Sequence, residues 1–354
     1  MGKTAVVFSQ KYYQHNTGKG HPESAKRLGA IVNELKRGKL SRSKNWQFVA
    51  PSKARIEDVE LIHDIEYVRF VENFCRSGGG FLDSEDTVVS SESFDVALYA
   101  VGGTLKAVNL VMKGLFKNAF ALVRPPGHHA EKFYAFGFCI FNNVAIAAKH
   151  LTSKFGLKRV LILDIDAHHG NGTQRTFYNS DKVLYISLHQ DPRAFPGTGL
   201  VDEIGTGRGL SYNVNVPLPF QTTDRVYLKA VKEIVAPIAC QYKPQFILVS
   251  AGLDCHYADS IADMSLSVLG YQRIYDIIGK LASNTCKGRL VSVLEGGYST
   301  RFIGKIAATI IAKKCGAAFS VNDESPMPNK NIENKGEKII KKVKEAHRAF
   351  WNLK

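Results

Sequence analysis

The sequence has no long hydrophobic run and few residues of the kinds that mark unusual classes of protein. No apolar run approaches the ~18 residues that a membrane helix needs, and polar residues from Gln10 to His15 follow too early for a signal-peptide core. With 12 prolines, 45% hydrophobic and 22% charged residues, the composition is typical of a packed globule, which excludes disordered, collagen-like and solenoid proteins. We therefore predict a soluble, cytoplasmic chain without a membrane partner.

Cysteine is scarce and irregularly spaced. The six cysteines form no Cys-x-x-Cys pair, so the sequence predicts neither a disulfide framework nor a cysteine zinc site. Nucleotide and acyl-enzyme motifs are missing as well: Gly205-Thr-Gly207-Arg-Gly209 is not a dinucleotide fingerprint, Gly18-Lys19-Gly20 lacks the P-loop frame, and there is no Gly-x-Ser-x-Gly elbow. Dinucleotide, phosphate and serine-hydrolase chemistry are therefore not supported.

Acidic residues are outnumbered by basic ones. The 47 Lys and Arg against 32 Asp and Glu give a formal net charge of +15, which favours anionic partners such as nucleic acid. The basic residues are spread along the chain, and their densest groups lie in residues 36–44 and 338–348. A simply solvated basic surface is therefore the alternative explanation. Nothing in the sequence indicates an oligomeric state.

Short buried strands and amphipathic helices alternate along the chain. The apolar runs that predict strands are residues 5–8, 120–123, 159–163, 183–186, 246–250 and 290–294. The stretches with helical periodicity are residues 94–115, 143–155, 224–242 and 269–281. Because the two kinds of element alternate, we predict an α/β fold whose central sheet is mainly parallel, with helices on both faces.

The composition changes near the C-terminus. Residues 321–335 are rich in Asn, Pro, Ser, Glu and Lys, which predicts a linker. After it, Ile339, Val343, Ala346 and Phe350 share one helical face with lysines opposite, so we expect a basic amphipathic helix that docks on the main body. This divides the chain into a main domain of residues 1–315 and a segment of residues 316–354 that contains the linker and this helix.

Polar clusters follow five of the predicted strands directly. In an open parallel sheet, ligands bind beyond the carboxyl ends of the strands, so clusters placed there converge on one region of space. That convergence predicts an enzyme. The clusters are Arg124-Pro-Pro-Gly-His128-His129, Asp164-Ile-Asp166-Ala-His168-His169-Gly-Asn171, Ser187-Leu-His189, Ala251-Gly-Leu-Asp254-Cys-His256 and Glu295-Gly-Gly-Tyr298.

The second cluster has the spacing of a metal site. Asp164, Asp166 and His168 alternate with small or apolar residues, so in an extended segment their side chains project to the same side. Carboxylate and imidazole ligands suit a divalent metal, and Asp254 could complete three protein ligands with one open position, as in a catalytic zinc site. Spacing alone leaves open which two of the three clustered residues bind metal. The alternative is that a strand-end Asp only caps the next helix.

The remaining clusters offer groups for proton transfer. His128 and His129 follow a rigid Pro-Pro-Gly turn at a strand end, and we interpret them as a source of a general base near neutral pH rather than as buried structural histidines. Tyr298 follows two glycines, which allow the backbone to turn a phenol towards the site, where its hydroxyl could donate to an oxyanion. An ordinary Gly-Gly-Tyr turn is the alternative.

Taken together, these clusters resemble the zinc-dependent histone deacetylase family, which includes acetylpolyamine amidohydrolases and prokaryotic homologues. Gly137-Phe-Cys139 and Phe195-Pro-Gly-Thr-Gly199 add to the resemblance, which runs in the family's order from His21-Pro-Glu23 to Tyr298. It implies an arginase-like single α/β domain, and it makes residues 1–315 the deacetylase catalytic domain.

The resemblance also implies roles for individual residues. One Zn²⁺ per chain would be bound by Asp166, His168 and Asp254. Asp164 would hold His128, and His128 and His129 would form the acid–base pair. Tyr298 would polarise the carbonyl. Because Asn171 stands where some members have an acid, His129 is less strongly held in a charged state.

Substrate and potassium sites are implied in the same way. A narrow acyl-lysine tunnel would have two aromatic walls, a glycine at its side, an aliphatic rim residue and a rim carboxylate, which are Phe138, Phe195, Gly137, Ile261 and Asp86. A K⁺ ion would be bound by the carbonyls of Asp164, Asp166, His168 and Leu188 and by the Ser187 hydroxyl.

The resulting hypothesis is a zinc-dependent amidohydrolase that removes acetyl groups from acetyl-lysine side chains with metal-activated water. One alternative is an amidohydrolase for acetylpolyamines or other small acylamines. Another is a catalytically inactive acetyl-lysine-binding module, although every catalytic position is retained. A protein with a charge of +15 repels cationic polyamines at long range, which favours acetylated protein as the substrate, while a locally acidic rim would weaken this preference.

Overall fold

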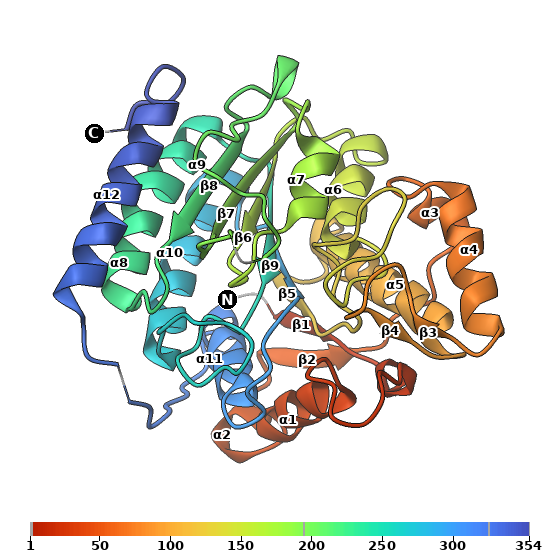
Figure 1. Ribbon diagram of the computed structural model, residues 1–354. Helices are drawn as coiled ribbons and strands as arrows, with labels where there is room; N and C mark the ends of the chain where they lie inside the picture. Colours follow the sequence, from red (N-terminus) through yellow and green to blue (C-terminus); the bar gives the residue numbers. More distant parts are fainter. Residues whose placement is uncertain (1–2, 194, 325, 354) are drawn as a thin grey trace.

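The six predicted strands lie next to one another in a parallel sheet of eight strands (Figure 1). The computed structural model describes residues 3–193, 195–324 and 326–353. In spatial order the strands are β2 (Trp46–Val49), β1 (Thr4–Val7), β5 (Asn118–Ala121), β10 (Leu290–Leu294), β9 (Phe246–Ala251), β6 (Val160–Asp164), β7 (Val183–Gln190) and β8 (Asn213–Leu218). A separate antiparallel pair is formed by β3 (Gly80–Phe81) and β4 (Val88–Val89).

The two strands of this sheet that were not predicted are its two edges. The inner strands are buried on both faces and read as continuous apolar runs. In contrast, β2 is only partly buried, and β8 alternates Asn and Val before Pro217. Asn213 and Asn215 both donate from their side-chain NH₂ groups to Gln174 Oε1 at 2.8 Å, so these donors have a partner inside the protein. Proline is tolerated in an edge strand.

Helices cover both faces of the sheet. On one face, α5 contacts β1, β5 and β10 while α6 contacts β6 and β9, and on the other face α10 contacts β9 and α11 contacts β1 (Figure 1). The four predicted helical stretches correspond to α5, α6, the α8–α9 pair joined by a π-helical turn at Val231–Val235, and α10. The helices are α1 (Ala25–Leu35), α2 (Gly38–Ser41), α3 (Ile56–Val59), α4 (Ile65–Arg76), α5 (Ser93–Met112), α6 (Asn143–Ser153), α7 (Asn171–Phe177), α8 (Asp224–Ala230), α9 (Ala236–Tyr242), α10 (Val268–Cys286), α11 (Ile303–Cys315) and α12 (Lys330–His347).

One of these helices, α5, is long and apolar enough to cross a membrane by length and composition alone, which the sequence prediction did not anticipate. In the folded chain, 78% of its apolar window is buried against other parts of the protein. A helix that is apolar on nearly all sides and packs inside a domain is a core helix. The composition of α5 is therefore explained by its place against the sheet.

The five strands followed by polar clusters are consecutive in the sheet, in the order β5, β10, β9, β6 and β7. Because all of them are parallel, their carboxyl ends lie at one edge and bring the clusters together. The strand ends differ from the predicted ones by at most two residues except in β7, which continues to Gln190, so Ser187 and Leu188 lie inside that strand and not after it. The extra residues of β7 pair with β8.

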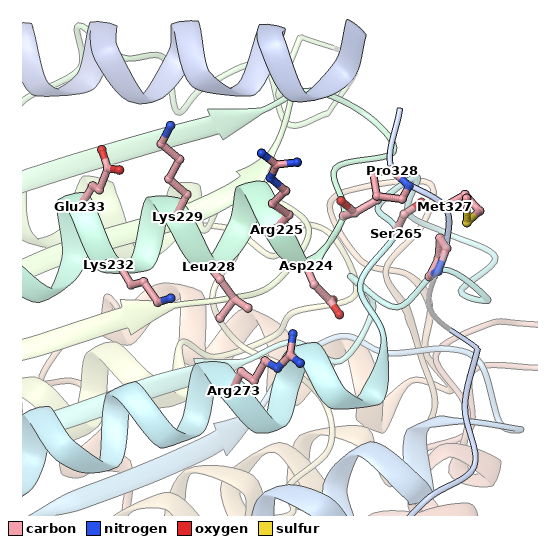
Figure 2. Close-up of a pocket in the computed structure, with 12 residues that line it drawn as sticks. Asp224, Arg225, Leu228, Lys229, Lys232, Glu233, Ser265, Arg273, Met327 and Pro328 are labelled. Carbon is pink, nitrogen blue, oxygen red and sulfur yellow. The ribbon is translucent and has the colours of Figure 1, made fainter. Parts of the chain in front are cut away.

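The C-terminal helix packs on the main body. The predicted linker extended too far, because α12 begins at Lys330, where the Asn329 side chain accepts hydrogen bonds from the backbone of the first turn. Ile340 and Val343 are buried, and α12 contacts α8 and β8. Before α12, Met327 and Pro328 lie beside the start of α8 and line a pocket of about 570 Å³, with Arg273 of α10 across from them (Figure 2).

Candidate active site

A pocket of about 200 Å³ lies at the carboxyl ends of these strands. Its lining brings together most of the residues that the sequence placed in a site, drawn from the five loops that follow β5, β6, β7, β9 and β10 and from the segment around residue 86. These are Asp86, His128, His129, Gly137, Phe138, Asp166, His168, Phe195, Ile261 and Tyr298, together with Pro126 and Gly296. Asp164 and Asp254 lie behind this lining and are completely buried.

Three predicted metal ligands converge at the inner end of the pocket. His168 Nδ1 lies 3.3 Å from Asp166 Oδ1 and 3.3 Å from Asp254 Oδ2. One ligand atom from each residue lies within 4.8 Å of the other two, and all three residues are buried. Two carboxylates and one imidazole in this arrangement are suited to a divalent metal with an open position.

The polar contacts around these ligands leave one lone pair unused. Asp254 Oδ1 accepts from the Ala167 amide at 2.9 Å, and Asp166 Oδ2 accepts from the Gly296 amide at 2.8 Å. Asp254 Oδ2 is buried and makes no hydrogen bond, although it lies 3.3 Å from the His168 ring. A buried carboxylate oxygen without a hydrogen bond is costly unless a cation satisfies it, so this donor set fits a metal ion.

The buried negative charge of the two carboxylates also favours protonation of the cluster when no metal is bound. Burial lowers the pKa of His168, but its contacts with Asp166 and Asp254 outweigh this and raise the pKa to about 10. Burial and the negative charge of Asp166 raise the pKa of Asp254 to about 7. In the absence of a metal, protons therefore take the place of the cation in this cluster.

The first histidine of the pair is held by a carboxylate. His128 Nδ1 lies 3.1 Å from Asp164 Oδ2, which also accepts from the Tyr185 hydroxyl at 3.0 Å. His128 Nε2 lies 3.9 Å from Asp166 Oδ1. Burial disfavours the imidazolium, but Asp166 and Asp164 outweigh it and raise the pKa of His128 to about 10. These carboxylates would stabilise a proton taken up from the pocket.

The second histidine has a neutral partner. His129 Nδ1 lies 2.8 Å from Asn171 Oδ1, and the His129 ring packs edge-on against Phe195. Burial, followed by the nearby charge of His128, holds the pKa of His129 well below its usual value. The two imidazoles therefore differ in charge although they are neighbours in the sequence.

Tyr298 is positioned from several sides. The Asp259 carboxylate accepts from the Tyr298 amide at 2.6 Å, and the Arg27 guanidinium lies over the phenol ring. The Phe138 ring contacts it edge-on, with ring centres 5.8 Å apart. Burial raises the pKa of Tyr298 well above its usual value, although Arg27 opposes the shift. The hydroxyl consequently stays a hydrogen-bond donor at neutral pH.

The predicted tunnel residues lie around the same pocket. Gly137 has φ +54°, and a Cβ there would lie 2.5 Å from His129 Cδ2, so only glycine fits. Phe138 follows with φ +68° and donates its amide to Thr87 Oγ1 at 3.0 Å. Ile261 is 39% exposed at the rim, and Asp86 accepts from the Ser84 hydroxyl at 2.6 Å.

Three of the predicted potassium residues lie on adjacent strands, Asp164 on β6 and Ser187 and Leu188 on β7, while Asp166 and His168 follow β6. Ser187 on β7 is in register with Asp164 on β6. Its hydroxyl lies 2.8 Å from His189 Nδ1, and the Leu188 carbonyl accepts from the Tyr227 hydroxyl at 3.3 Å. The strand pairing explains why these residues come together with the Asp164 segment.

Sequence reasoning missed a buried ion cluster beside the pocket. Glu23 Oε1 accepts from Arg27 at 3.0 Å and from Arg124 Nε at 2.7 Å, and all three side chains are buried. Arg27 also donates to the carbonyls of Glu295 and Gly297, which flank Gly296 at the metal ligands. The spacing of Glu23 and Arg27, four residues apart near the start of α1, could have predicted their ion pair from the sequence. No sequence feature indicated that Asp259 would reach the site.

Comparisons with known proteins agree with this geometry. The sequence model of the histone deacetylase domain matches residues 21–314. A probable deacetylase of Archaeoglobus fulgidus is 41% identical over 98% of each chain. A histone deacetylase-like amidohydrolase of Pseudomonas aeruginosa is 34% identical over 85% of this chain and 78% of its own. The crystal structure of the HDA15 HD domain has a TM-score of 0.88 at 33% identity and covers 99% of this chain and 95% of that one.

Proposed function

The chain belongs to the histone deacetylase family and is a hydrolase that acts on amides, and from this premise we propose that it removes acetyl groups from lysine side chains with one bound zinc ion. The observation that carries the proposal is the convergence of Asp166, His168 and Asp254 at the end of a pocket that also exposes His128 and Tyr298. Every role that amide hydrolysis requires has a candidate group there.

Asp166, His168 and Asp254 would hold the metal. When bound, a divalent ion would supply Lewis-acid activation of the amide carbonyl and of a water molecule. Asp254 Oδ2 supports this assignment, because this buried oxygen makes no hydrogen bond and lies 3.3 Å from His168 Nδ1, so that the same cation could contact both atoms. The amides of Ala167 and Gly296 orient the two carboxylates, which reduces the reorganisation that metal binding would require.

Proton transfer falls to the histidine beside Asp164. We propose that His128 acts as a base with a neutral ring, because a cation held by Asp166 would offset the negative charge that raises the His128 pKa, and that Nε2 then accepts a proton from the attacking water as the water oxygen bonds to the carbonyl carbon. The carboxylate at Nδ1 orients the ring and stabilises the imidazolium that forms. When the bond between carbon and nitrogen breaks, a protonated histidine of the His128–His129 pair delivers a proton to the departing amine, and acetic acid is released, which ionises at neutral pH. Tyr298 donates its hydroxyl to the carbonyl oxygen, where negative charge develops.

The shape of the pocket supports a linear acyl-lysine side chain. Phe138 and Phe195 are among its lining residues, and aromatic walls of this kind suit a methylene chain. Asp86 at the pocket would accept hydrogen bonds from the substrate backbone. The alternative is an acetylated polyamine or another small acylamine, which Asp86 would also attract. The net charge of +15 favours acetylated protein.

The decisive experiment compares rates on an acetyl-lysine peptide and on an acetylated polyamine, with the metal content measured on the same preparation. We expect about one zinc per chain and a higher kcat/KM on the peptide. A higher kcat/KM on the polyamine would select the alternative substrate. A preparation that contains zinc but cleaves neither amide would contradict the proposed reaction.

We also propose that K⁺ binds between β6 and β7, at the carbonyls of Asp164, Asp166, His168 and Leu188 and the Ser187 hydroxyl. The register that places Ser187 opposite Asp164 supports it. Replacing K⁺ in the buffer by a large organic cation at constant ionic strength should lower kcat. Unchanged kinetics and unchanged thermal stability in that buffer would exclude the site. Association with nucleic acid stays a prediction that rests on charge.

A further inference from the structure

Outside the pocket lining, we infer that Glu131 is a positioning residue that determines, through the Asn171 amide, which nitrogen of His129 carries a proton. The inference rests on the proposed function, because it concerns a member of the acid–base pair. Its subject, however, is the tautomer of an imidazole, and that can be observed without any substrate.

Glu131 lies behind the pocket, two residues after His129. Its side chain is 5% exposed, and its two carboxylate oxygens have different partners. Oε1 accepts from Asn171 Nδ2 at 3.0 Å, and Oε2 pairs with Arg175 Nε at 2.8 Å. The Arg175 side chain is 70% exposed, so this ion pair reaches the surface of α7. The carboxylate therefore connects solvent-exposed charge to the amide beside His129.

The contacts of Asn171 fix the orientation of its amide. The Asn171 NH₂ group lies 3.0 Å from the Glu131 carboxylate and 3.3 Å from the backbone carbonyl of His129. When Glu131 is ionised, its carboxylate and the His129 carbonyl are both acceptors and cannot donate a hydrogen bond. A flipped amide would place its oxygen against these two acceptors and deprive both of the donor that they now share. The NH₂ group must therefore stay on this side, and Oδ1 must face His129.

The orientation of Asn171 decides the tautomer of His129. Oδ1 lies 2.8 Å from His129 Nδ1 and can only accept, so Nδ1 must carry the proton. In the neutral imidazole, Nε2 is then an acceptor, and it lies on the side of the ring away from Asn171. A flipped amide would reverse both nitrogens and present an Nε2–H donor to the pocket. Glu131 thus prevents the second histidine from adopting the wrong tautomer.

A purely structural explanation is that Glu131 only pairs with Arg175 and anchors α7. The two explanations differ in what Arg175 contributes. If the ion pair is what matters, Arg175→Gln should have the same effect as Glu131→Gln. If the carboxylate acts on Asn171, Arg175→Gln leaves that contact intact, and kcat should stay close to the wild-type value.

The direct test is ¹⁵N NMR of histidine-labelled protein with its metal content measured, in which the two neutral tautomers give different nitrogen shifts and couplings. The His129 signals are identified by their loss in His129→Gln. We expect the Nδ1–H form in the wild type and in Arg175→Gln. In Glu131→Gln, the carbonyl of His129 is the one remaining obligate acceptor for the Asn171 amide, so the Nε2–H form should become populated.

Kinetics provide a second readout with an internal rescue. Glu131→Gln should lower kcat about 10–100-fold, the usual effect of removing a partner that orients a catalytic group, with KM and metal content unchanged. Asn171→Asp introduces a carboxylate that cannot flip, but next to Glu131 it creates a repulsive pair, so it should also be impaired. The double variant Glu131→Gln/Asn171→Asp removes the repulsion and still accepts from Nδ1, so kcat should recover most of its loss.

The outcomes separate this inference from the proposed reaction. An Nε2–H signal for His129 in the wild type, or a pure Nδ1–H signal in folded Glu131→Gln, would overturn the role of Glu131 whether or not the protein is a deacetylase. A double variant no better than Glu131→Gln would do the same. An Nδ1–H signal that shifts as expected in a protein that cleaves no acetyl amide would uphold the role of Glu131 while contradicting the proposed function. If Glu131→Gln does not fold, an Nε2–H signal for His129 in the wild type would still overturn the role of Glu131.

Discussion

The guanidinium carbon of Arg27 lies 4.8 Å from the centre of the Tyr298 ring. Its Nε donates to the Gly297 carbonyl at 2.6 Å, so the cation is fixed to the same turn that carries the phenol. A buried cation over an aromatic face stabilises the ring in one position. Arg27 on α1 thereby constrains Tyr298, which follows β10, and helps to keep its hydroxyl in the pocket.

This constraint makes Tyr298→Phe a clean test of transition-state stabilisation. The variant loses only a hydroxyl and keeps the ring that packs on Arg27 and Phe138. Removing a donor to a developing oxyanion typically costs ~10²–10³-fold in kcat. We expect that loss with bound metal and KM close to wild type, measured by steady-state kinetics and metal analysis. Wild-type turnover by the metal-loaded variant would remove Tyr298 from the mechanism.

Metal binding should release protons. The contacts of His168 with Asp166 and Asp254 raise its pKa to about 10 against the effect of burial, so it is protonated at pH 7 in the metal-free protein, and a ligand must be neutral. Burial and the negative charge of Asp166 raise the pKa of Asp254 as well, which also favours protons in the metal-free cluster. Zinc affinity should therefore weaken as the pH falls from 8 to 6. Calorimetric titration in two buffers of different ionisation enthalpy measures the released protons.

The ligand assignment has its own control. Asp254→Ala and His168→Ala should each lose most bound zinc together with activity, and zinc added after chelation should restore the wild type but neither variant. In the calorimetric titration of the wild type, identical heats of zinc binding in the two buffers would show that no protons are released and would contradict a protonated metal-free cluster. Full metal occupancy in either variant would contradict the choice of ligands.

The sequence predicted the part of the site that follows from strand order. The clusters around His128, Asp166, Asp254 and Tyr298 are each contiguous with a buried strand, and adjacent parallel strands bring them together. Arg27 and Asp259 reach the same site from a helix and from a loop. No periodicity connects such positions, because their proximity depends on the tertiary path of the chain.

The same dependence on tertiary structure explains which strands of the sheet the sequence did not predict. Strands buried on both faces are identified by composition, whereas β2 and β8 lie at the edges and carry polar or half-exposed residues. In β8, the side-chain NH₂ groups of Asn213 and Asn215 donate to Gln174 on α7, some forty residues away. A strand whose polar side chains find their partners at that distance cannot be distinguished from a loop by its local pattern.

We expect the ionised Glu23 carboxylate to contribute to the free energy of unfolding, and this contribution to decrease at acidic pH. Burial would raise its pKa, but Arg124 and Arg27 outweigh burial and lower it to about 2. A depressed carboxyl pKa stabilises the fold fully above the unfolded value near 4.5, and that contribution is lost as the pH falls towards 2. Glu23→Gln leaves two buried cations unpaired and should cost about 3–5 kcal/mol at pH 7.

The comparison for Glu23→Gln is Glu66→Gln. Glu66 pairs with Arg69 at 2.9 Å on the surface, where both side chains are more than half exposed, so its loss should cost about 0–1 kcal/mol. Urea unfolding from pH 7 to pH 3 should show the gap between wild type and Glu23→Gln narrowing below pH 4.5. A gap that stays constant with pH would mean that the Glu23 charge does not stabilise the fold.

Gly137→Ala should block the pocket from its side. A Cβ at this position would lie 2.5 Å from His129 Cδ2 and 3.2 Å from His129 Nε2, so the imidazole must move. Gly156→Ala is the matched control, because Gly156 has a similar positive φ of +67° but open space around it. Both variants should lose about 1–2 kcal/mol of stability from the left-handed backbone. Only Gly137→Ala should also lose kcat/KM, by about 100-fold or more if displacement removes His129 from proton transfer. Equal kcat/KM in the two variants, with both folded and metal-loaded, would show that the pocket tolerates a side chain at residue 137 and that the contact with His129 does not define its wall.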